Sequence, residues 1–143
     1  MKLLDRLKTK KGFIKGLDHI AIIVKDMDRS ITFYSEVLDL VILHDGRSEG
    51  GDKKSFIGTK DKSLIALTEN PDKKIGEHPD QSVSHIAFEV ADIEKAKTNL
   101  ESKAIEFIEI KNNSKGDPVA YHFLDPDGFE LEIYNDTEKV APY

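Results

Sequence analysis

The sequence predicts an α+β fold made of two copies of one module, each a strand, a helix and three further strands. The first observation is an internal repeat: HIAIIVKD at residues 19–26 returns as HIAFEVAD at residues 85–92, an interval of 66 positions (85 minus 19). The second is that each copy is followed by a helix-like apolar period and then by short strand-like runs separated by turn residues. A repeat of this length indicates a supersecondary unit that cannot complete its core alone.

The first module follows the repeat in a regular order. Residues 17–24 alternate between two faces and are rich in β-branched side chains, which indicates a half-buried strand. A helix is then expected to begin at Asp26 or Asp28, whose carboxylates can cap it, and to run through Leu38 with an apolar period near 3.6. Three strands are predicted to follow, near residues 41–45, 54–58 and 63–68.

The second module repeats that order. A strand is predicted at 84–90 and a helix at 93–103, entered through Asp92. Three strands follow, near residues 105–111, 119–124 and 129–134. The sequence DPDG at 125–128 is a strong turn signal, because each of its residues favours a turn for its own physical reason.

These elements predict a single domain over residues 16–135, which is long enough to bury one shared core. Within this domain we expect module one (16–69), a polar linker (70–82) and module two (83–135). A basic extension (1–15) precedes the domain and a tail (136–143) follows it.

Charge and composition exclude several classes of protein. The net charge is −6, whereas residues 1–15 alone carry +5, so the rest of the chain carries −11 (−6 minus 5). An acidic domain of this kind argues against a nucleic-acid partner. The chain has no cysteine, no apolar run of transmembrane length and no signal-peptide pattern, so we expect a cytoplasmic protein without a membrane partner.

Strand parity indicates which polar side chains meet. Because successive side chains of a strand point to opposite faces, His19 and His85 both leave the face on which the apolar residues of their strands pack. In the last strand Glu132 falls on the histidine face, and its counterpart in module one is Ala66 (132 minus 66). The duplication therefore offers four positions around a common centre: His19, Ala66, His85 and Glu132.

Two neutral imidazoles and one carboxylate form a suitable site for a divalent transition metal. A set of three protein ligands leaves positions for water or substrate, which is typical of catalytic sites. Without thiolates, Fe(II), Mn(II), Ni(II), Co(II) and Zn(II) are all candidates. A single histidine on a solvated strand face is usually an ordinary surface residue, but repetition in register favours a metal site held by His19, His85 and Glu132.

The paired His-Ile-Ala strands, the helices entered through Asp26 and Asp92, and the sequence DPDGFELE at 125–132 together resemble the vicinal oxygen chelate superfamily. That superfamily includes glyoxalase I, bleomycin resistance proteins, fosfomycin resistance enzymes and extradiol dioxygenases. The resemblance covers about residues 16–135. It implies two βαβββ modules forming a U-shaped, partly open mixed β-barrel flanked by helices, around one divalent metal ion and usually in a homodimer. The ligand positions that it implies are again His19, Ala66, His85 and Glu132.

Departures from the family pattern narrow the activities that the resemblance implies. Glyoxalase I and methylmalonyl-CoA epimerase use a Glu or Gln ligand at the place held here by Ala66, so both are disfavoured. Thiol transferases of the fosfomycin group typically carry Thr at the place of Ala21 and an arginine just beyond the last strand, where residues 135–138 read NDTE. Extradiol dioxygenases carry a tyrosine at the place of His122. Their upstream catalytic histidine has no counterpart at residues 111–118 of this chain, which weakens this activity too.

His122 is a further histidine that is not part of the predicted triad. In the geometry that the resemblance implies it faces the cavity, where it could act as an acid, a base or a substrate donor, or could simply fill a polar wall. Its counterpart in module one is Phe56 (122 minus 66), which would give the cavity an apolar side. We therefore predict that Phe56, Ala66 and His122 face the substrate, with His122 as the candidate catalytic group.

Two classes of function are consistent with these residues. The first is a metalloenzyme, of lyase, dioxygenase or thiol transferase type, acting on a small oxygen-rich or electrophilic molecule. The second is a metal-free protein of the bleomycin-resistance type that sequesters a small molecule such as a drug or antibiotic. Retention of all three ligands favours the enzyme, because a sequestering protein has no need of them.

Overall fold

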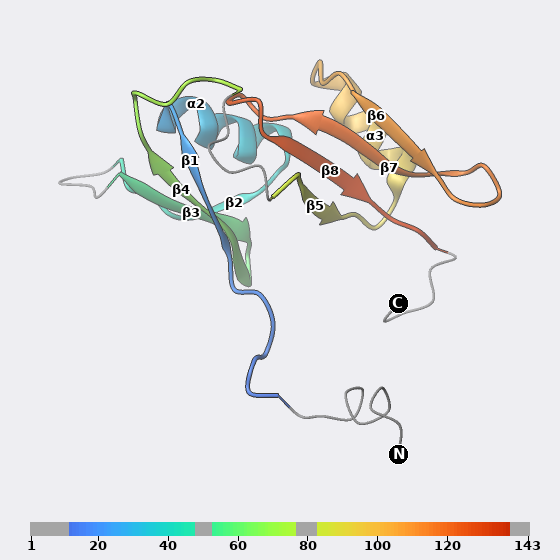
Figure 1. Cartoon of the computed structure of the whole chain (residues 1–143), viewed down its shortest axis with the longest axis horizontal. Helices are drawn as coiled ribbons and strands as arrows, with labels where there is room; N and C mark the ends of the chain where they lie inside the picture. Colours follow the sequence, from blue (N-terminus) through green and yellow to red (C-terminus); the bar gives the residue numbers. More distant parts are fainter. Residues whose placement is uncertain (1–11, 48–52, 77–82, 138–143) are drawn as a thin grey trace.

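The computed structural model describes residues 12–47, 53–76 and 83–137 (Figure 1). Most of the predicted extension and tail, and the end of the linker, lie outside these ranges. The elements are β1 (Ile20–Val24), α2 (Met27–Thr32), the π-helix η1 (Phe33–Val37), β2 (Val41–His44), β3 (Lys54–Thr59), β4 (Lys62–Glu69), β5 (Ile86–Glu89), α3 (Ile93–Ser102), β6 (Glu109–Asn112), β7 (Pro118–Leu124) and β8 (Glu130–Tyr134).

Each module forms one four-stranded mixed sheet, and the two sheets have the same topology. The strand orders are β1-β4-β3-β2 and β5-β8-β7-β6, in which only the β1–β4 and β5–β8 pairs are parallel. The registers repeat as well: Ile20 pairs with Ile65, and Ile86 pairs with Leu131, an offset of 66 at both positions (86 minus 20, 131 minus 65). The predicted α+β fold with two βαβββ modules is confirmed.

The helices begin at the predicted aspartates. The side chains of Asp26 and Asp92 each accept a hydrogen bond of 3.0 Å from the backbone N–H three residues further along, which satisfies one of the free donors at a helix start. Asp26, rather than Asp28, is therefore the cap of α2. The first helix widens into π-type turns over Phe33–Val37, a departure from the regular helix that the apolar period predicts.

Four strands begin later than predicted, and the largest differences are at β1 (residue 20 instead of 17) and β6 (residue 109 instead of 105). The ladder between β1 and β4 starts only at the pair Ile20 and Ile65, so the residues before Ile20 extend away from the sheet. In module two, the backbone N–H of Ile105 donates to the carbonyl of Leu100 at 3.1 Å and thereby closes the end of α3. The chain consequently joins the sheet only at Glu109, where β6 begins.

One face of each sheet packs against the helices, and strand parity holds in both modules. Ile22 and Phe88 are half-buried, whereas their neighbours Ala21 and Ala87 are exposed. The core consists of Val24, Met27, Ile31, Tyr34, Ile57, Ile65, Leu67, Ile86, Leu100, Tyr121, Phe123, Leu131 and Ile133. Among the described residues, no helix has the length and apolar character needed to cross a membrane.

Two buried aspartates in the turn between β7 and β8 fasten module two to module one. Asp127 accepts hydrogen bonds from the backbone N–H of Lys25 at 2.9 Å and from the hydroxyl of Ser30 at 3.4 Å. Asp125 accepts a hydrogen bond of 2.8 Å from the hydroxyl of Tyr34. All three partners belong to module one, so the DPDG turn also serves as a contact between the modules.

Replacing Asp125 by asparagine is expected to change how stability depends on pH. Burial raises the pKa of Asp125 above its ordinary value of 3.8, with hydrogen bonds from Tyr34 and a backbone N–H acting in the opposite direction. A raised carboxyl pKa in the folded protein contributes stability that is complete below pH 3.8 and is lost as the pH rises through the folded-state pKa. Asparagine has no such titration. The free energy of unfolding of Asp125→Asn, relative to the original protein, should therefore rise with pH over this window.

Urea denaturation at a series of pH values above about 4 measures this difference, since the unfolded reference titrates near there. Asp61→Asn is the matched control, because Asp61 is exposed in the equivalent region of module one. If the free energies of unfolding of Asp125→Asn and of the original protein differ by the same amount at every pH, burial does not raise the pKa of Asp125.

Candidate metal centre

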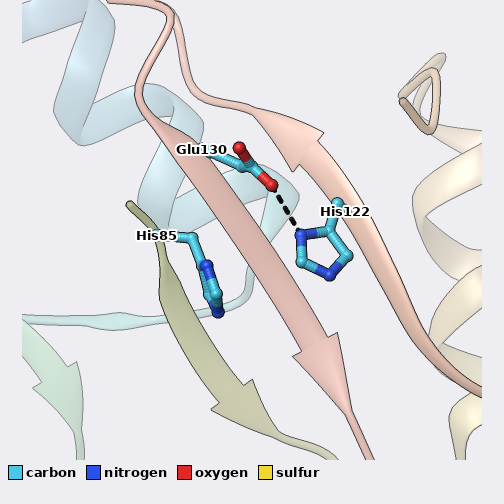
Figure 2. Close-up of side chains that lie close together, drawn as sticks. All are labelled: His85, His122 and Glu130. Carbon is cyan, nitrogen blue, oxygen red and sulfur yellow. Dashed lines mark hydrogen bonds and ion pairs between the residues drawn. The ribbon is translucent and has the colours of Figure 1, made fainter. Parts of the chain in front are cut away.

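Module two brings two histidines and two glutamates together. His85 immediately precedes β5, His122 lies in β7, and Glu130 and Glu132 lie in β8. Since β8 runs between β5 and β7, and Glu132 pairs with His122 in the ladder, the sheet itself positions these side chains. Figure 2 shows His85, His122 and Glu130 gathered around β8. We refer to His85, His122, Glu130 and Glu132 as the imidazole–carboxylate cluster.

The shortest contacts in the cluster join imidazole nitrogens to carboxylate oxygens. Nε2 of His85 lies 2.9 Å from Oε2 of Glu132, and Nε2 of His122 lies 3.4 Å from the same oxygen. Nδ1 of His122 lies 2.7 Å from Oε1 of Glu130 (Figure 2). The two rings stand edge to face with their centroids 5.2 Å apart. One oxygen of Glu132 therefore faces a nitrogen from each ring.

Burial differs between the members of the cluster. The side chains of His122 and Glu132 are 1% and 8% exposed, whereas that of His85 is 32% exposed and reaches solvent. Nε2 of His122 is buried and has no hydrogen-bond partner. Leaving a buried polar atom unsatisfied costs about 1–3 kcal/mol, so this nitrogen indicates a missing partner.

The cluster fits a divalent transition metal. Imidazole nitrogen and carboxylate oxygen are both ligands of first-row metals. Among the described residues, the ligand atoms of His85, His122 and Glu130 lie within 4.8 Å of one another. Glu130 and Glu132 both contact His122 and bring two carboxylates to the same cluster, and negative charge of this kind favours a dication. The buried Nε2 of His122, which has no hydrogen-bond partner, independently indicates that a cation fits this cluster.

His85 and Glu132 of the predicted triad come together, but His19 lies elsewhere. His19 is exposed just before β1, with Nδ1 2.7 Å from Oδ1 of Asp18 and its ring edge to face against Phe56 at a centroid distance of 5.5 Å. Within the described part of one chain, the group of possible metal donors does not include His19. A role for His19 as a ligand stays a prediction.

The two other residues predicted to face the substrate occupy equivalent places in module one. Phe56 pairs with Ala66 in the ladder, as His122 pairs with Glu132 in module two. Ala66 is buried, and the half-buried ring of Phe56 contacts the rings of His19 and His44. Contact of Phe56, Ala66 or His122 with a substrate stays a prediction.

Glu130 is the member of the cluster that sequence reasoning missed. Parity places Glu130 and Glu132 on the same face, yet only Glu132 is the register counterpart of Ala66 and was therefore predicted as a ligand. The contact of Glu130 with His122 is a diagonal one, because the residue directly opposite His122 is Glu132. The signal in the sequence was the pair of glutamates two positions apart behind the turn.

Comparisons with known proteins are consistent with this architecture. Residues 16–133 match the family described as Glyoxalase/Bleomycin resistance protein/Dioxygenase superfamily. Lactoylglutathione lyase of Schizosaccharomyces pombe is 30% identical over a match that covers 85% of this chain, which spans about half (48%) of that longer protein. Glutathione transferase FosA of Serratia marcescens is 28% identical, with 85% of this chain and 81% of that protein covered. A glyoxalase/dioxygenase structure from Nostoc punctiforme superposes with a TM-score of 0.72 at 25% identity, covering 90% of this chain and 96% of the other.

Proposed function

Because the chain belongs to the Glyoxalase/Bleomycin resistance protein/Dioxygenase superfamily, we propose that it is a divalent-metal-dependent enzyme acting on a small oxygen-rich or electrophilic metabolite or xenobiotic. The main support is the 2.9 Å contact between Nε2 of His85 and Oε2 of Glu132, beside the buried and unpartnered nitrogen of His122. Relatives of this chain carry names as different as lyase and transferase, so the fold alone does not fix the reaction.

The metal ligands in this proposal come from both modules. His85 and Glu132 bind from module two, and His19 binds from module one. Since His19 is exposed and lies outside the cluster of its own chain, it would reach the metal from a second copy in a homodimer. Exposed apolar side chains on the outermost strands offer surface for such a contact, namely Val41, Ile42 and Leu43 of β2 and Ile110 of β6.

Fe, Mn, Ni, Co or Zn would suit these donors, and when bound would supply Lewis acidity to chelated substrate oxygens. The residues around the donors would decide what the site accepts. Ala66 has no donor atom and leaves space at the symmetric ligand position, while Phe56 contributes an apolar wall. The missing side-chain ligand at Ala66 still disfavours glyoxalase I and methylmalonyl-CoA epimerase activities, even though one relative is named lactoylglutathione lyase.

A metal-free protein that sequesters a small molecule is the alternative. Such a protein gains nothing from a buried imidazole with an unpartnered nitrogen next to a buried carboxylate, because both groups cost desolvation energy. The imidazole–carboxylate cluster therefore supports the enzyme over the sequestering protein.

Metal analysis tests the proposal. Protein purified without chelator or nickel resin should bind about one first-row divalent ion per chain, and His85→Ala and Glu132→Ala should lose binding, because ligands must be preserved for affinity. Glu89→Ala is the matched control, since this exposed carboxylate lies on the same face of β5 as His85 and should leave binding unchanged. Failure of the original protein to bind any of these ions would overturn the enzyme proposal.

A further inference from the structure

We propose that His122 is a further metal ligand, an inference that rests on the proposed function and extends its donor set. His122 belongs to module two, as His85 and Glu132 do, so one chain would supply three donors by itself. Together with His19 the metal would then have three imidazole ligands and one carboxylate ligand.

Glu130 fixes the orientation of the His122 ring. The 2.7 Å contact between Nδ1 of His122 and Oε1 of Glu130 is a short hydrogen bond in which Nδ1–H donates to the carboxylate. A carboxylate on one ring nitrogen sets the tautomer and directs the lone pair of the other nitrogen at the metal, as is common around metal-bound histidines. Nε2 of His122 is therefore the free donor, and Glu130 acts through this ring rather than as a ligand.

The spacing of the donor atoms fits one metal ion. Bonds of about 2.0–2.2 Å to nitrogen and oxygen place neighbouring ligand atoms roughly 2.8–3.6 Å apart, in octahedral or tetrahedral geometry. Nε2 of His85 and Nε2 of His122 lie 2.9 Å and 3.4 Å from the same oxygen of Glu132. That oxygen is therefore at a ligand-to-ligand distance from both nitrogens.

Burial separates His122 from a histidine that merely completes a polar wall. Its side chain is 1% exposed, and Nε2 makes no hydrogen bond although Oε2 of Glu132 lies only 3.4 Å away. A structural histidine at this depth would be expected to donate from both nitrogens or to meet a donor. A cation held between Nε2 and the carboxylate satisfies both atoms at once.

The internal repeat provides an independent comparison within the same chain. In module two, His122 of β7 pairs with Glu132 of β8, and both side chains are of kinds that bind metals. In module one the facing pair of β3 and β4 is Phe56 and Ala66, neither of which can bind a metal. The imidazole thus occurs opposite the carboxylate and is absent where the carboxylate is absent. His122 would supply from β7 the fourth donor that Ala66 lacks.

Four protein donors would leave positions for a substrate only on an ion that binds more than four ligands, and a six-coordinate ion would keep two positions open. Two open positions would suit a substrate that chelates through two oxygens.

The test compares His122→Gln, which cannot offer an imidazole nitrogen, with Glu130→Gln and with His44→Gln. Affinities for Co²⁺ and Zn²⁺ are measured by chelator competition, and the visible spectrum of the Co²⁺ form reports the ligand set. We expect His122→Gln to weaken binding by more than about 100-fold and to change the spectrum, whereas Glu130→Gln should weaken it by about 10–100-fold, the range for loss of an outer partner. His44→Gln removes an exposed imidazole and should change neither.

X-ray absorption of the Zn²⁺-loaded original protein counts the imidazoles without any substitution, so the test does not depend on the variants folding. Three imidazoles support the inference. Two imidazoles also support it if the count stays at two in the Zn²⁺-loaded His19→Ala protein, where His85 and His122 remain. Two imidazoles that fall to one in His19→Ala, or a His122→Gln variant with the original affinity and spectrum, would overturn it while leaving the proposed function intact if His85→Ala still abolishes binding. A wild-type protein that binds no metal would instead overturn the proposed function itself.

Discussion

Replacing Asp127 by alanine is expected to lower the free energy of unfolding by about 2–4 kcal/mol, a large fraction of the stability of a small domain. Asp127 is fully buried in the turn between β7 and β8. Its carboxylate accepts hydrogen bonds from the backbone N–H of Lys25 and the hydroxyl of Ser30, and it lies 3.4 Å from the guanidinium of Arg29. These partners lie at the end of β1 and in α2, so the substitution would weaken the contact between the modules as well as the turn.

The magnitude follows from what the alanine would leave behind. The N–H of Lys25 would lose its acceptor, and Nη2 of Arg29, which makes no hydrogen bond, would lose the carboxylate 3.4 Å away. Groups left uncompensated in this way cost more than the lost contact itself. Removal of one partner from a fully buried ion pair costs about 3–5 kcal/mol. Because the side chain of Arg29 is 37% exposed, solvent screening reduces the ion-pair share.

The internal repeat supplies a matched control for this substitution. Asp61 is the counterpart of Asp127 in module one (127 minus 66), but it is exposed. Asp61→Ala should therefore change the free energy of unfolding by no more than about 0.5 kcal/mol. Urea denaturation of both variants measures the two effects. Equal stabilities for Asp127→Ala and Asp61→Ala would show that the buried carboxylate does not hold the modules together.

Periodicity predicted most of the architecture because the two modules repeat a strong pattern. The order of strands and helices follows from apolar spacing and from the caps Asp26 and Asp92, and the offset of 66 in the sequence is reproduced in the ladder registers. Strand ends were less predictable. The start of β1 depends on where β4 offers a partner, and the start of β6 depends on how α3 closes, neither of which is local to the strand.

Parity predicted the faces of the site residues, but not their partners. It placed His85, Glu132 and Glu130 on one face of module two, and the cluster forms there. It could not show that Glu130 reaches diagonally to His122, because that depends on side-chain length and rotamer. The DPDG sequence likewise predicted a turn, whereas the bonds of Asp125 and Asp127 to module one depend on how two distant segments pack. Sequence reasoning at this level finds positions and leaves long-range contacts open.

Parity also predicted the face of His19 without predicting its partners. Parity places it on the face of its sheet that corresponds to His85, but a face does not specify which copy of the chain it meets. In the structure of one chain His19 lies against Asp18 and Phe56, and the donors of module two lie in a different sheet. In the proposed function, His19 would therefore come from a second copy of the chain.

Combining two variants that each lack one proposed ligand is expected to restore metal binding. If each site combines His19 of one chain with His85 and Glu132 of another, a heterodimer of His19→Ala and Glu132→Ala chains contains one site without defects and one site with both. Each variant alone has only defective sites. The heterodimer, purified through two different tags without nickel resin, should therefore bind about one metal ion per dimer with the original affinity, whereas ligand loss weakens binding in both homodimers.

Chelator competition measures the number of sites that keep the original affinity. The control is a heterodimer of His85→Ala and Glu132→Ala chains, which should show no recovery because both residues come from the same module and every site receives one of the two defects. Absence of recovery in the His19→Ala and Glu132→Ala heterodimer would contradict a site shared between two copies. Original affinity in the His19→Ala homodimer would instead remove His19 from the ligand set, and the metal would then be held by the donors of module two alone.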